Sequence, residues 1–158
     1  MKFLFICTHN RCRSILSEAI ANHFGEGKIQ ACSAGSQPVG EVHPLSLKYL
    51  QERGINTEGL QSQFWDEFEQ EQPRVVITVC DSAANEQCPV WFGGCVRVHW
   101  GLPDPSKLHG SEDEIKAAFF SVMDTIEVRI RRVLEFALND LSDDELRLAL
   151  NQITQAGR

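Results

Sequence analysis

The sequence predicts an α/β fold in which a mainly parallel sheet is covered by helices on both faces. Three observations predict it: continuous apolar runs typical of buried strands, segments of helical hydrophobic spacing between them, and turn-rich stretches at the junctions. Because each crossover between parallel strands needs a covering helix, this alternation favours three layers, α/β/α. A chain of 158 residues fits one core, so we expect residues 1–158 to form a single domain.

The first half of the chain alternates strand and helix. Residues 2–6 predict a buried strand that stops at a polar loop. A helix then opens at Ser14, with these apolar residues on one face: Ile15, Leu16, Ala19, Ile20 and Phe24. We expect a second short strand over residues 29–34 and a helix over residues 45–53 that stops at Gly54.

The second half continues this order. Residues 65–68 predict a short helix, and the β-branched run 75–79 predicts a strand covered on both faces. Residues 96–99 are a weaker fourth strand, followed by a loop over residues 100–106 whose two prolines exclude regular structure. Capping-box spacing then opens a long helix and a final amphipathic helix, at Ser111 with Glu114 and at Ser142 with Glu145.

Charge and composition exclude several classes of protein. The formal net charge of -7 argues against a nucleic-acid-binding surface, which needs clustered Lys and Arg. The apolar start, residues 2–7, is too short for a signal peptide or a membrane span, so we expect a cytoplasmic protein.

Cysteine usage points to thiol chemistry or to buried thiols. The six residues are Cys7, Cys12, Cys32, Cys80, Cys88 and Cys95. Without an export signal we expect them to be mostly reduced. No pair has the Cys-x2-Cys spacing of a zinc knuckle or a thioredoxin-type site, so we expect no metal site.

Three loops are expected at one edge of the sheet, because ligands of parallel sheets bind at the carboxyl ends of the strands. These loops cover residues 7–13, 80–88 and 100–106. In the first, a Cys, five further residues, Arg13 and Ser14 stand between a strand and a helix. Backbone N–H groups at such a helix N-terminus form a cradle for a tetrahedral oxyanion. We expect the anion to be bound by Thr8, His9, Asn10, Arg11, Cys12 and Arg13.

Individual roles follow from the chemistry of this loop. Arg13 would hold two anion oxygens, and the helix N-terminus together with Arg13 would favour a thiolate at Cys7. Ser14 would donate its hydroxyl to the Cys7 sulfur, while Asn10 would hold the shape of the loop. Cys12 is assigned to packing. A single cysteine at a strand end is more often a small buried hydrophobe, but the Arg and Ser at these offsets favour catalysis.

This loop resembles the catalytic loop of the low-molecular-weight protein tyrosine phosphatase superfamily. Further motifs resemble the arsenate reductases built on that fold, over a stretch running from residue 1 to the end of the long helix. They are Ile15-Leu-Ser-Glu-Ala19, Ser33-Ala-Gly35, Val79-Cys-Asp81, Cys88-Pro89, His99-Trp-Gly101 and Asp104-Pro105. The resemblance implies a four-stranded parallel sheet flanked by helices.

The resemblance also implies roles for individual residues. Cys7 would attack arsenate, and Asp104 would protonate the departing oxygen. Cys80 would then attack the Cys7 sulfur and expel arsenite, leaving a disulfide. In the thioredoxin-coupled branch, Cys88 would take over that disulfide and carry it to the surface, which requires residues 81–87 to move.

Other interpretations of these residues stay open. Cys80 and Cys88 can be a buried thiol and an incidental loop thiol, Cys32 and Cys95 are assigned to packing, and Asp104 can be a turn residue only. The external reductant can be thioredoxin or glutathione with glutaredoxin, with no bound cofactor. Cys88-Pro89 favours thioredoxin.

Two other functions compete with arsenate reduction. The first is a phosphatase, because phosphate and arsenate share shape and charge. However, Ser106 stands where phosphatases of this fold usually carry a tyrosine, and Tyr49 is the only tyrosine in the chain. The second is an oxyanion-binding module without turnover, which would have little need for a thiolate, an acid and two further thiols.

Overall fold

The computed structural model describes residues 1–156 and contains one four-stranded parallel sheet. The strands are β1 (Lys2–Ile6), β2 (Gln30–Ala34), β3 (Val75–Thr78) and β4 (Val96–His99), in the spatial order β2-β1-β3-β4. Each apolar run that predicts a strand forms one. Phe3, Leu4, Phe5 and Ile6 of β1 are all at most 1% exposed, as a central strand covered on both faces requires.

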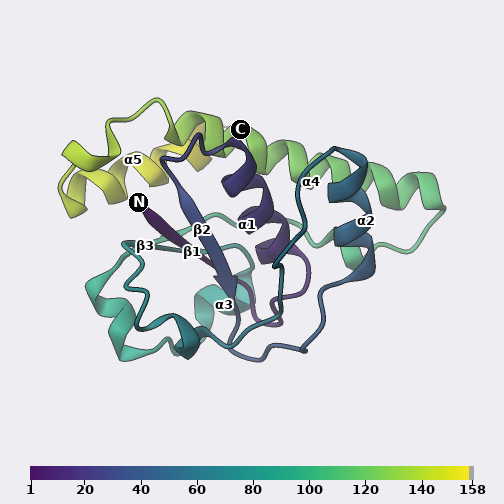
Figure 1. The fold of residues 1–158 in the computed structure, drawn as a ribbon, viewed down its shortest axis with the longest axis horizontal. Helices are drawn as coiled ribbons and strands as arrows, with labels where there is room; N and C mark the ends of the chain where they lie inside the picture. The colour runs from purple at the N-terminus through teal and green to yellow at the C-terminus, as the bar shows by residue number, and fades with distance from the viewer. Residues whose placement is uncertain (157–158) are drawn as a thin grey trace.

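Helices connect the strands. They are α1 (Arg13–Phe24), α2 (Pro44–Glu52), α3 (Asp81–Asn85), α4 (Glu112–Val133) and α5 (Asp143–Ala156). Short 3-10 turns are η1 (Trp65–Phe68), η2 (Val90–Gly94), η3 (Pro105–Lys107) and η4 (Leu138–Asp140). Figure 1 shows α4 and α5 on one side of the sheet and α3 on the other. The predicted three-layer architecture is therefore confirmed.

Local sequence signals set the helix ends. Ser142 and Glu145 form the predicted capping box, since Ser142 N–H donates to Glu145 Oε1 at 2.9 Å and Glu145 N–H donates to Ser142 Oγ at 3.2 Å. Ser111 likewise accepts from the Glu114 N–H at 3.1 Å at the start of α4. Gly54 follows α2 with φ +73°, a conformation that favours glycine.

The sequence does not predict α3 or the 3-10 turns η2, η3 and η4, and the expectation that residues 100–106 exclude regular structure is wrong at η3, because a proline is tolerated at the first position of a helical turn. Residues 81–87 were expected to be an irregular mobile loop, but Asp81–Asn85 is helical. Cys80 caps this helix through its sulfur, which accepts from the Ala83 N–H at 3.4 Å. A sulfur is a weak acceptor and is not one of the usual capping side chains, so the sequence carries no ordinary start signal here.

The order of the strands indicates where on the sheet a ligand can bind. β2 and β3 pair with opposite sides of β1. The loops that follow β1 and β3 therefore diverge at the carboxyl ends of these two strands. Such a switch point is where open parallel sheets bind ligands. Among residues 1–156, no helix combines the length and apolar character needed to cross a membrane.

Candidate active site

The three predicted loops meet in one small pocket at the switch point. The pocket has a volume of about 100 Å³, which is about three water volumes. That volume suits a small tetrahedral anion. Its lining includes Cys7, Arg13, Cys80 and Asp104. The other lining residues are Thr8, His9, Arg11, Cys12, Ser82, Ser106 and Lys107.

Asn10 holds the anion loop in shape, as predicted. It is fully buried with φ +47°, and its amide donates to Ser14 Oγ at 2.8 Å and to Ser33 Oγ at 3.0 Å. Its side-chain oxygen accepts from the Gln63 N–H at 2.8 Å. The side chain therefore lies beneath the loop and does not line the pocket, which corrects its place among the anion-binding residues.

Gly35 lets the neighbouring chain approach the loop. A Cβ there would lie 2.4 Å from the Thr8 carbonyl oxygen and 2.5 Å from that of Cys7. No side chain fits at these distances, so a glycine is required. Gly35 N–H donates to the Gln63 carbonyl at 2.9 Å, which continues the support beneath the loop.

Ser14 does not hydrogen-bond to the Cys7 sulfur in the part of the chain that the structure describes. Its hydroxyl oxygen instead accepts from Asn10, and the residue is fully buried. The expectation that Ser14 donates to Cys7 is therefore wrong for this state. The helix starts at Arg13, so the Ser14 side chain points into the support of the loop.

Arg13 and Asp104 lie together at the mouth of the pocket. Arg13 Nη1 donates to the Leu102 carbonyl at 3.1 Å, and Nη2 lies 3.6 Å from Asp104 Oδ2. A guanidinium has five N–H donors, so several remain for an anion. Asp104 also accepts from the Ser106 N–H at 3.0 Å and from Ser106 Oγ at 2.6 Å. Asp104 thus caps a turn and lines the pocket, so its two proposed roles coexist.

Cys7 and Cys80 meet because their strands are neighbours. β1 and β3 pair with Ile6 opposite Thr78, and the Val79 N–H extends the ladder to the Ile6 carbonyl at 2.9 Å. Each cysteine follows the end of this ladder, and both line the same pocket. A hydrogen bond between the two sulfurs lowers the pKa of Cys80 to about 5 and, together with burial, raises the pKa of Cys7.

This arrangement bears on the expectation of a thiolate on Cys7. Two neighbouring thiols share one proton, because ionising the second would place two negative charges side by side. The Ala83 N–H donates to Cys80 and supports a charge there, whereas Arg13 supports a charge on Cys7. The thiolate on Cys7 therefore stays a prediction.

Cys88 lies outside this pocket. It is partly exposed and lines a separate hollow beside η2, with Trp65, Gln87 and Trp91. α3 lies between Cys80 and Cys88 in the chain. The structure therefore brings Cys7 and Cys80 together and leaves Cys88 apart.

The remaining cysteines have packing environments, as predicted. Burial raises the pKa of Cys12 to about 11 and that of Cys32 to about 12, and it also raises the pKa of Cys95. The Cys32 thiol donates to the Phe3 carbonyl, and the Cys95 thiol donates to the Trp91 carbonyl. Within residues 1–156 there is no group of three or more His, Cys, Asp or Glu that could hold a metal ion.

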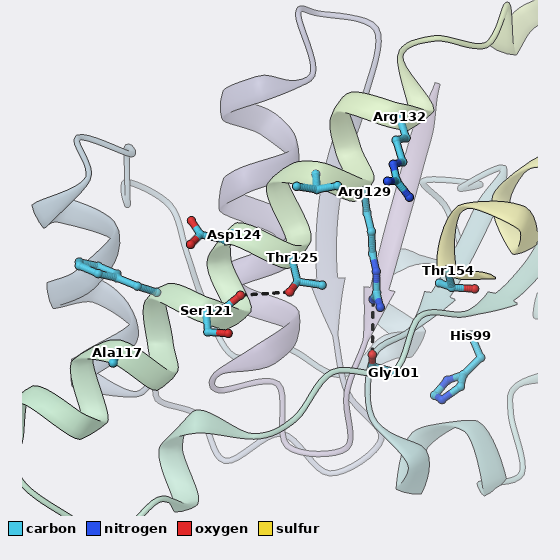
Figure 2. Close-up of a pocket in the computed structure, with 11 residues that line it drawn as sticks. His99, Gly101, Ala117, Ser121, Asp124, Thr125, Arg129, Arg132 and Thr154 are labelled. Atoms are coloured by element: carbon cyan, nitrogen blue, oxygen red, sulfur yellow. Dashed lines mark hydrogen bonds between the residues drawn. The ribbon is translucent and has the colours of Figure 1, made fainter. Parts of the chain in front are cut away.

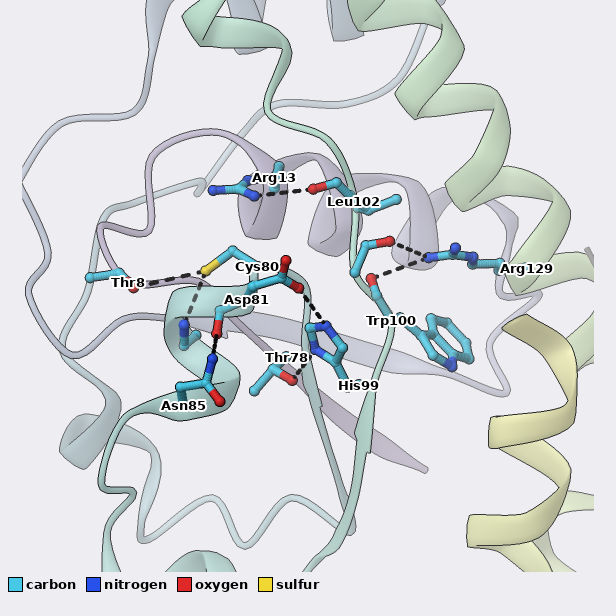
Figure 3. A network of polar contacts seen from close by, with 12 residues as sticks. Thr8, Arg13, Thr78, Cys80, Asp81, Asn85, His99, Trp100, Leu102 and Arg129 are labelled. Carbon is cyan, nitrogen blue, oxygen red and sulfur yellow. Dashed lines mark hydrogen bonds and ion pairs between the residues drawn. The ribbon is translucent and has the colours of Figure 1, made fainter. Parts of the chain in front are cut away.

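Polar contacts link the site to the rest of the sheet edge (Figure 3). His99 bonds to Thr78 Oγ1 through Nδ1 at 2.7 Å and to Asp81 Oδ1 through Nε2 at 3.0 Å. These contacts fasten the start of α3 to β3 and β4. The sequence motifs include Asp81 and His99, but no spacing rule pairs them.

A larger groove of about 870 Å³ lies beside α4 and shares no lining residue with the Cys7 pocket. Figure 2 shows Arg129 reaching across it to Gly101. Arg129 donates to the Trp100 carbonyl at 3.1 Å and to that of Gly101 at 3.4 Å. These bonds brace the loop that leads to Asp104.

Three residues at or beside the site are absent from the sequence predictions, and one of them is Ser82, which lines the pocket. Glu86 accepts a hydrogen bond from Thr8 Oγ1 at 2.5 Å, and Lys107 lines the pocket. Glu86 lies two residues before Cys88 in a stretch without an apolar period, so no sequence signal marks it.

Curated relatives of this chain are arsenate reductases. One from Bacillus licheniformis is 37% identical over 132 residues, covering 83% of this chain and 93% of the relative. A glutaredoxin arsenate reductase from Synechocystis is 34% identical over 104 residues, covering 66% of this chain and 78% of the relative. Both are named arsenate reductases, and only the second name specifies a reductant.

The fold comparison agrees. The solved structure of a thioredoxin-dependent arsenate reductase from Corynebacterium glutamicum matches with a TM-score of 0.64 and 28% identity, over 85% of this chain and 60% of that one. The family model described as low molecular weight phosphotyrosine protein phosphatase matches residues 2–145. This range contains every element from β1 to α4 and all three loops of the pocket. The chain therefore belongs to the low molecular weight phosphotyrosine protein phosphatase family.

Proposed function

We propose that this protein is an arsenate reductase that uses a cysteine thiolate in an oxyanion-binding loop. One observation carries the proposal: a second thiol, Cys80, lines the same small pocket as Cys7. A phosphatase has no step that needs a second thiol beside its nucleophile. An arsenate reductase needs one, because As(V) bound to sulfur takes two electrons from a thiol pair. The named relatives support the same function.

The first step forms a bond between Cys7 and arsenic. Arsenate occupies the loop with two oxygens on Arg13, and the shared proton moves to Cys80 so that Cys7 attacks as a thiolate. Asp104, which lines the same pocket beside Arg13, gives a proton to the departing oxygen, which leaves as water. Asp104 is protonated when it serves in this step, and the bound anion competes with it for Arg13.

The second step releases arsenite. Cys80 gives the proton that it took up in the first step to an oxygen on arsenic and attacks the Cys7 sulfur, so an S–S bond forms and the S–As bond breaks. The electron pair of that bond stays on arsenic, which falls from As(V) to As(III), while the two cysteines are oxidised to a disulfide. Both cysteines line the same small pocket, which favours this attack.

We propose that Cys88 then takes over the disulfide and that thioredoxin reduces the Cys80–Cys88 bridge. Cys88 is partly exposed beside η2, where a protein reductant has access. This transfer would leave Cys7 as a free thiol for the next turnover. Relatives of both the thioredoxin and the glutaredoxin type are known, so glutathione with glutaredoxin is the second candidate. We propose a cytoplasmic location, because a reducing compartment keeps six cysteines free.

Phosphatase activity is the second candidate function. Cys7, Arg13 and Asp104 suffice for hydrolysis of a small phosphate ester, so a slow side activity is expected. Recognition of an aromatic phosphoester has no support, since Tyr49 is 1% exposed and packs against Phe119 at 5.1 Å between ring centroids. Ser106 stands at the pocket and is hydrogen-bonded to Asp104.

The decisive experiment is an arsenate-dependent NADPH oxidation assay. One arm contains thioredoxin and thioredoxin reductase, and the other contains glutathione, glutaredoxin and glutathione reductase. Turnover in either arm supports arsenate reduction, and no turnover in both overturns it. Mass spectrometry after one turnover then separates the reductants: an internal Cys80–Cys88 bridge supports thioredoxin, and a glutathione adduct overturns that preference.

A further inference from the structure

Two arginines hold consecutive carbonyl groups of the loop that follows β4. Arg129 of α4 donates through Nη1 to the Trp100 carbonyl at 3.1 Å and to the Gly101 carbonyl at 3.4 Å. Arg13 of the anion pocket donates to the next carbonyl, that of Leu102, at 3.1 Å. The loop backbone therefore links a groove residue on α4 to the arginine of the anion pocket.

The amide groups of this loop are fixed to the end of β3. The Trp100 N–H donates to the Thr78 carbonyl at 2.8 Å, and the Leu102 N–H donates to the Val79 carbonyl at 3.0 Å. These bonds keep the loop against the sheet. Its carbonyls are held by the two arginines, so a change at Arg129 can turn the peptide groups of the loop without detaching it from β3.

The Leu102 carbonyl lies at the point where this loop meets the catalytic side chains. Nη1 of Arg13 is bonded to it, and Nη2 lies 3.6 Å from Asp104 Oδ2. Asp104 follows Leu102 by two residues in the same loop. Because a guanidinium is planar and rigid, a shift of the Leu102 carbonyl reorients the donors that Arg13 keeps for an anion.

Arg129 is half-buried and directs its charge at backbone carbonyls. Burial lowers its pKa, and among residues 1–156 it forms no ion pair. Asp124, which lines the same groove, pairs instead with Arg53. A half-buried cation without a counter-charge costs free energy of desolvation. A role in the site gives a reason for an arginine at this position.

We propose that Arg129 is a positioning residue for the anion pocket. By holding the two carbonyls that precede Leu102, it fixes the Leu102 carbonyl. That carbonyl in turn orients Arg13 beside Asp104. Arg129 lines the groove and not the pocket, and Figure 2 shows its side chain pointing from α4 to Gly101. The inference deepens the proposed function, on which it rests, by naming a residue that prepares the pocket for the oxyanion.

The test measures oxyanion binding without turnover. The full chain is treated with iodoacetamide at rising phosphate concentrations, and the protection of Cys7 is followed by mass spectrometry. Arg129→Ala should weaken phosphate binding by about tenfold or more, the order expected for one hydrogen bond to a charged group. Arg132→Ala is the matched control, because Arg132 lines the same groove but donates to the Ile153 carbonyl of α5 at 3.4 Å. Equal phosphate affinity in the two variants overturns the proposal.

Rescue by guanidinium separates positioning from a general loss of structure. Arg129→Ala leaves space beside a groove of about 870 Å³, which admits the small guanidinium ion. Guanidinium chloride at millimolar concentration should restore phosphate binding to Arg129→Ala and leave Arg132→Ala unchanged, with sodium chloride as the ionic-strength control. A loss that guanidinium does not restore shows a structural defect and overturns the proposal.

A lysine pair gives the answer if Arg129→Ala does not fold. Arg129→Lys keeps the charge on a stem one bond shorter, so it should hold the loop carbonyls less well and weaken phosphate binding several-fold. Arg132→Lys should not change phosphate binding. Equal affinities in the two lysine variants overturn the proposal.

The outcome is separable from that of the arsenate assay. If phosphate protection depends on Arg129 while no arsenate is reduced, the proposed function fails and the positioning role stands. If arsenate is reduced and phosphate binding does not depend on Arg129, only the positioning role fails. If phosphate never protects Cys7 in the wild type, both fail.

Discussion

Cys80 acts on Cys7 by both charge and position. Its sulfur caps α3 and accepts from the Ala83 N–H, and contact with Cys7 lowers its pKa to about 5. A thiol with a lowered pKa gives up its proton readily before it attacks. The same residue that takes the proton from Cys7 in the first step is therefore suited to be the attacking group in the second.

Changing Cys80 should separate the two chemical steps. In Cys80→Ser the first attack on an oxyanion can still occur, but no thiol remains to release arsenite. We expect arsenite release to be lost and hydrolysis of para-nitrophenyl phosphate to remain. Single-turnover arsenite detection and a phosphate-ester assay measure the two. Cys32→Ser is the control, because Cys32 contacts the Phe3 carbonyl away from the pocket. Equal loss of both activities would contradict a resolving role for Cys80.

For individual residues, the sequence predicts which ones form the site better than it predicts which side chains contact one another. The spacing of Cys7, Arg13 and Ser14 predicts the loop, and the side chain of Asn10 has its predicted role. The hydrogen bond from the Asn10 amide to the Ser14 hydroxyl oxygen is not among the predicted contacts. Glu86 is not predicted, because its contact with Thr8 spans 78 residues of chain and depends on the tertiary fold.

The backbone of the loop after β1 packs directly against Gly35. We expect Gly35→Ala to lower the free energy of unfolding by about 1–3 kcal/mol, the usual cost of overpacking, because its Cβ would meet two backbone carbonyls. Binding of phosphate should weaken as well, since those carbonyls belong to Cys7 and Thr8 of the anion loop. Urea unfolding and phosphate titration measure the two.

Gly94→Ala is the matched control for Gly35→Ala. A Cβ at Gly94 meets nothing within 4 Å. We therefore expect this variant to keep both stability and phosphate binding close to those of the wild type. Similar losses in the two variants would show that the close approach at Gly35 is not the cause.

α1 and β2 are joined by a buried carboxyl whose charge state depends on pH. Burial raises the pKa of Glu18 to about 7, although a hydrogen bond from Ser33 at 2.6 Å opposes the rise. The folded state thus binds this proton more tightly than the unfolded chain does. The resulting stability is fully present below the unfolded pKa of 4.5 and is lost as pH rises through about 7.

Glu18→Gln should remove this pH dependence. Across that window the wild type should lose about 3 kcal/mol from this group, whereas the neutral amide loses nothing. Urea unfolding at pH 5 and pH 8 measures the difference, and the variant should be the more stable at pH 8. An unchanged slope of stability with pH would mean that another group titrates in this range.

Hydrophobic periodicity and capping residues predict the long helices α4 and α5, whereas neither signal predicts α3. The capping boxes at Ser111 and Ser142 mark α4 and α5. α3 begins at a sulfur cap and is only five residues long, too short for a hydrophobic period to be visible. Its order comes from tertiary contacts such as the His99–Asp81 pair, and not from its own sequence.

At the scale of the whole molecule, we expect a bridge between Cys80 and Cys88 to require a rearrangement of the segment that joins them. Bridged cysteines have Cα atoms 4.4–6.8 Å apart, and here the two residues line different hollows with α3 between them in the chain. We expect α3 to unwind on oxidation. The amides of Ala84 and Glu86, which now donate to the carbonyls of Cys80 and Ala83, should exchange faster with solvent.

Hydrogen exchange on the reduced and oxidised protein measures this unwinding. The Leu134 amide near the end of α4, which donates to the Ile130 carbonyl, is the internal control and should keep its rate. Unchanged exchange across α3, with the Cys80–Cys88 bridge demonstrated by mass spectrometry, would show that the bridge forms without unwinding.

The overall topology follows from the sequence because alternation of strands and helices allows few arrangements. The strand order β2-β1-β3-β4 is not fixed by hydrophobic pattern alone, since the burial of each strand does not specify its neighbours. The resemblance to a known family supplies that part of the expectation, and the pairing of Ile6 with Thr78 confirms it.

That pairing has a consequence for how enzymes on this scaffold diversify. The end of β3 lies beside the nucleophile whatever residue it carries, so one substitution there adds or removes a redox partner while the anion loop stays intact. We therefore expect a substitution at this strand end to alter reduction while binding of the oxyanion is kept.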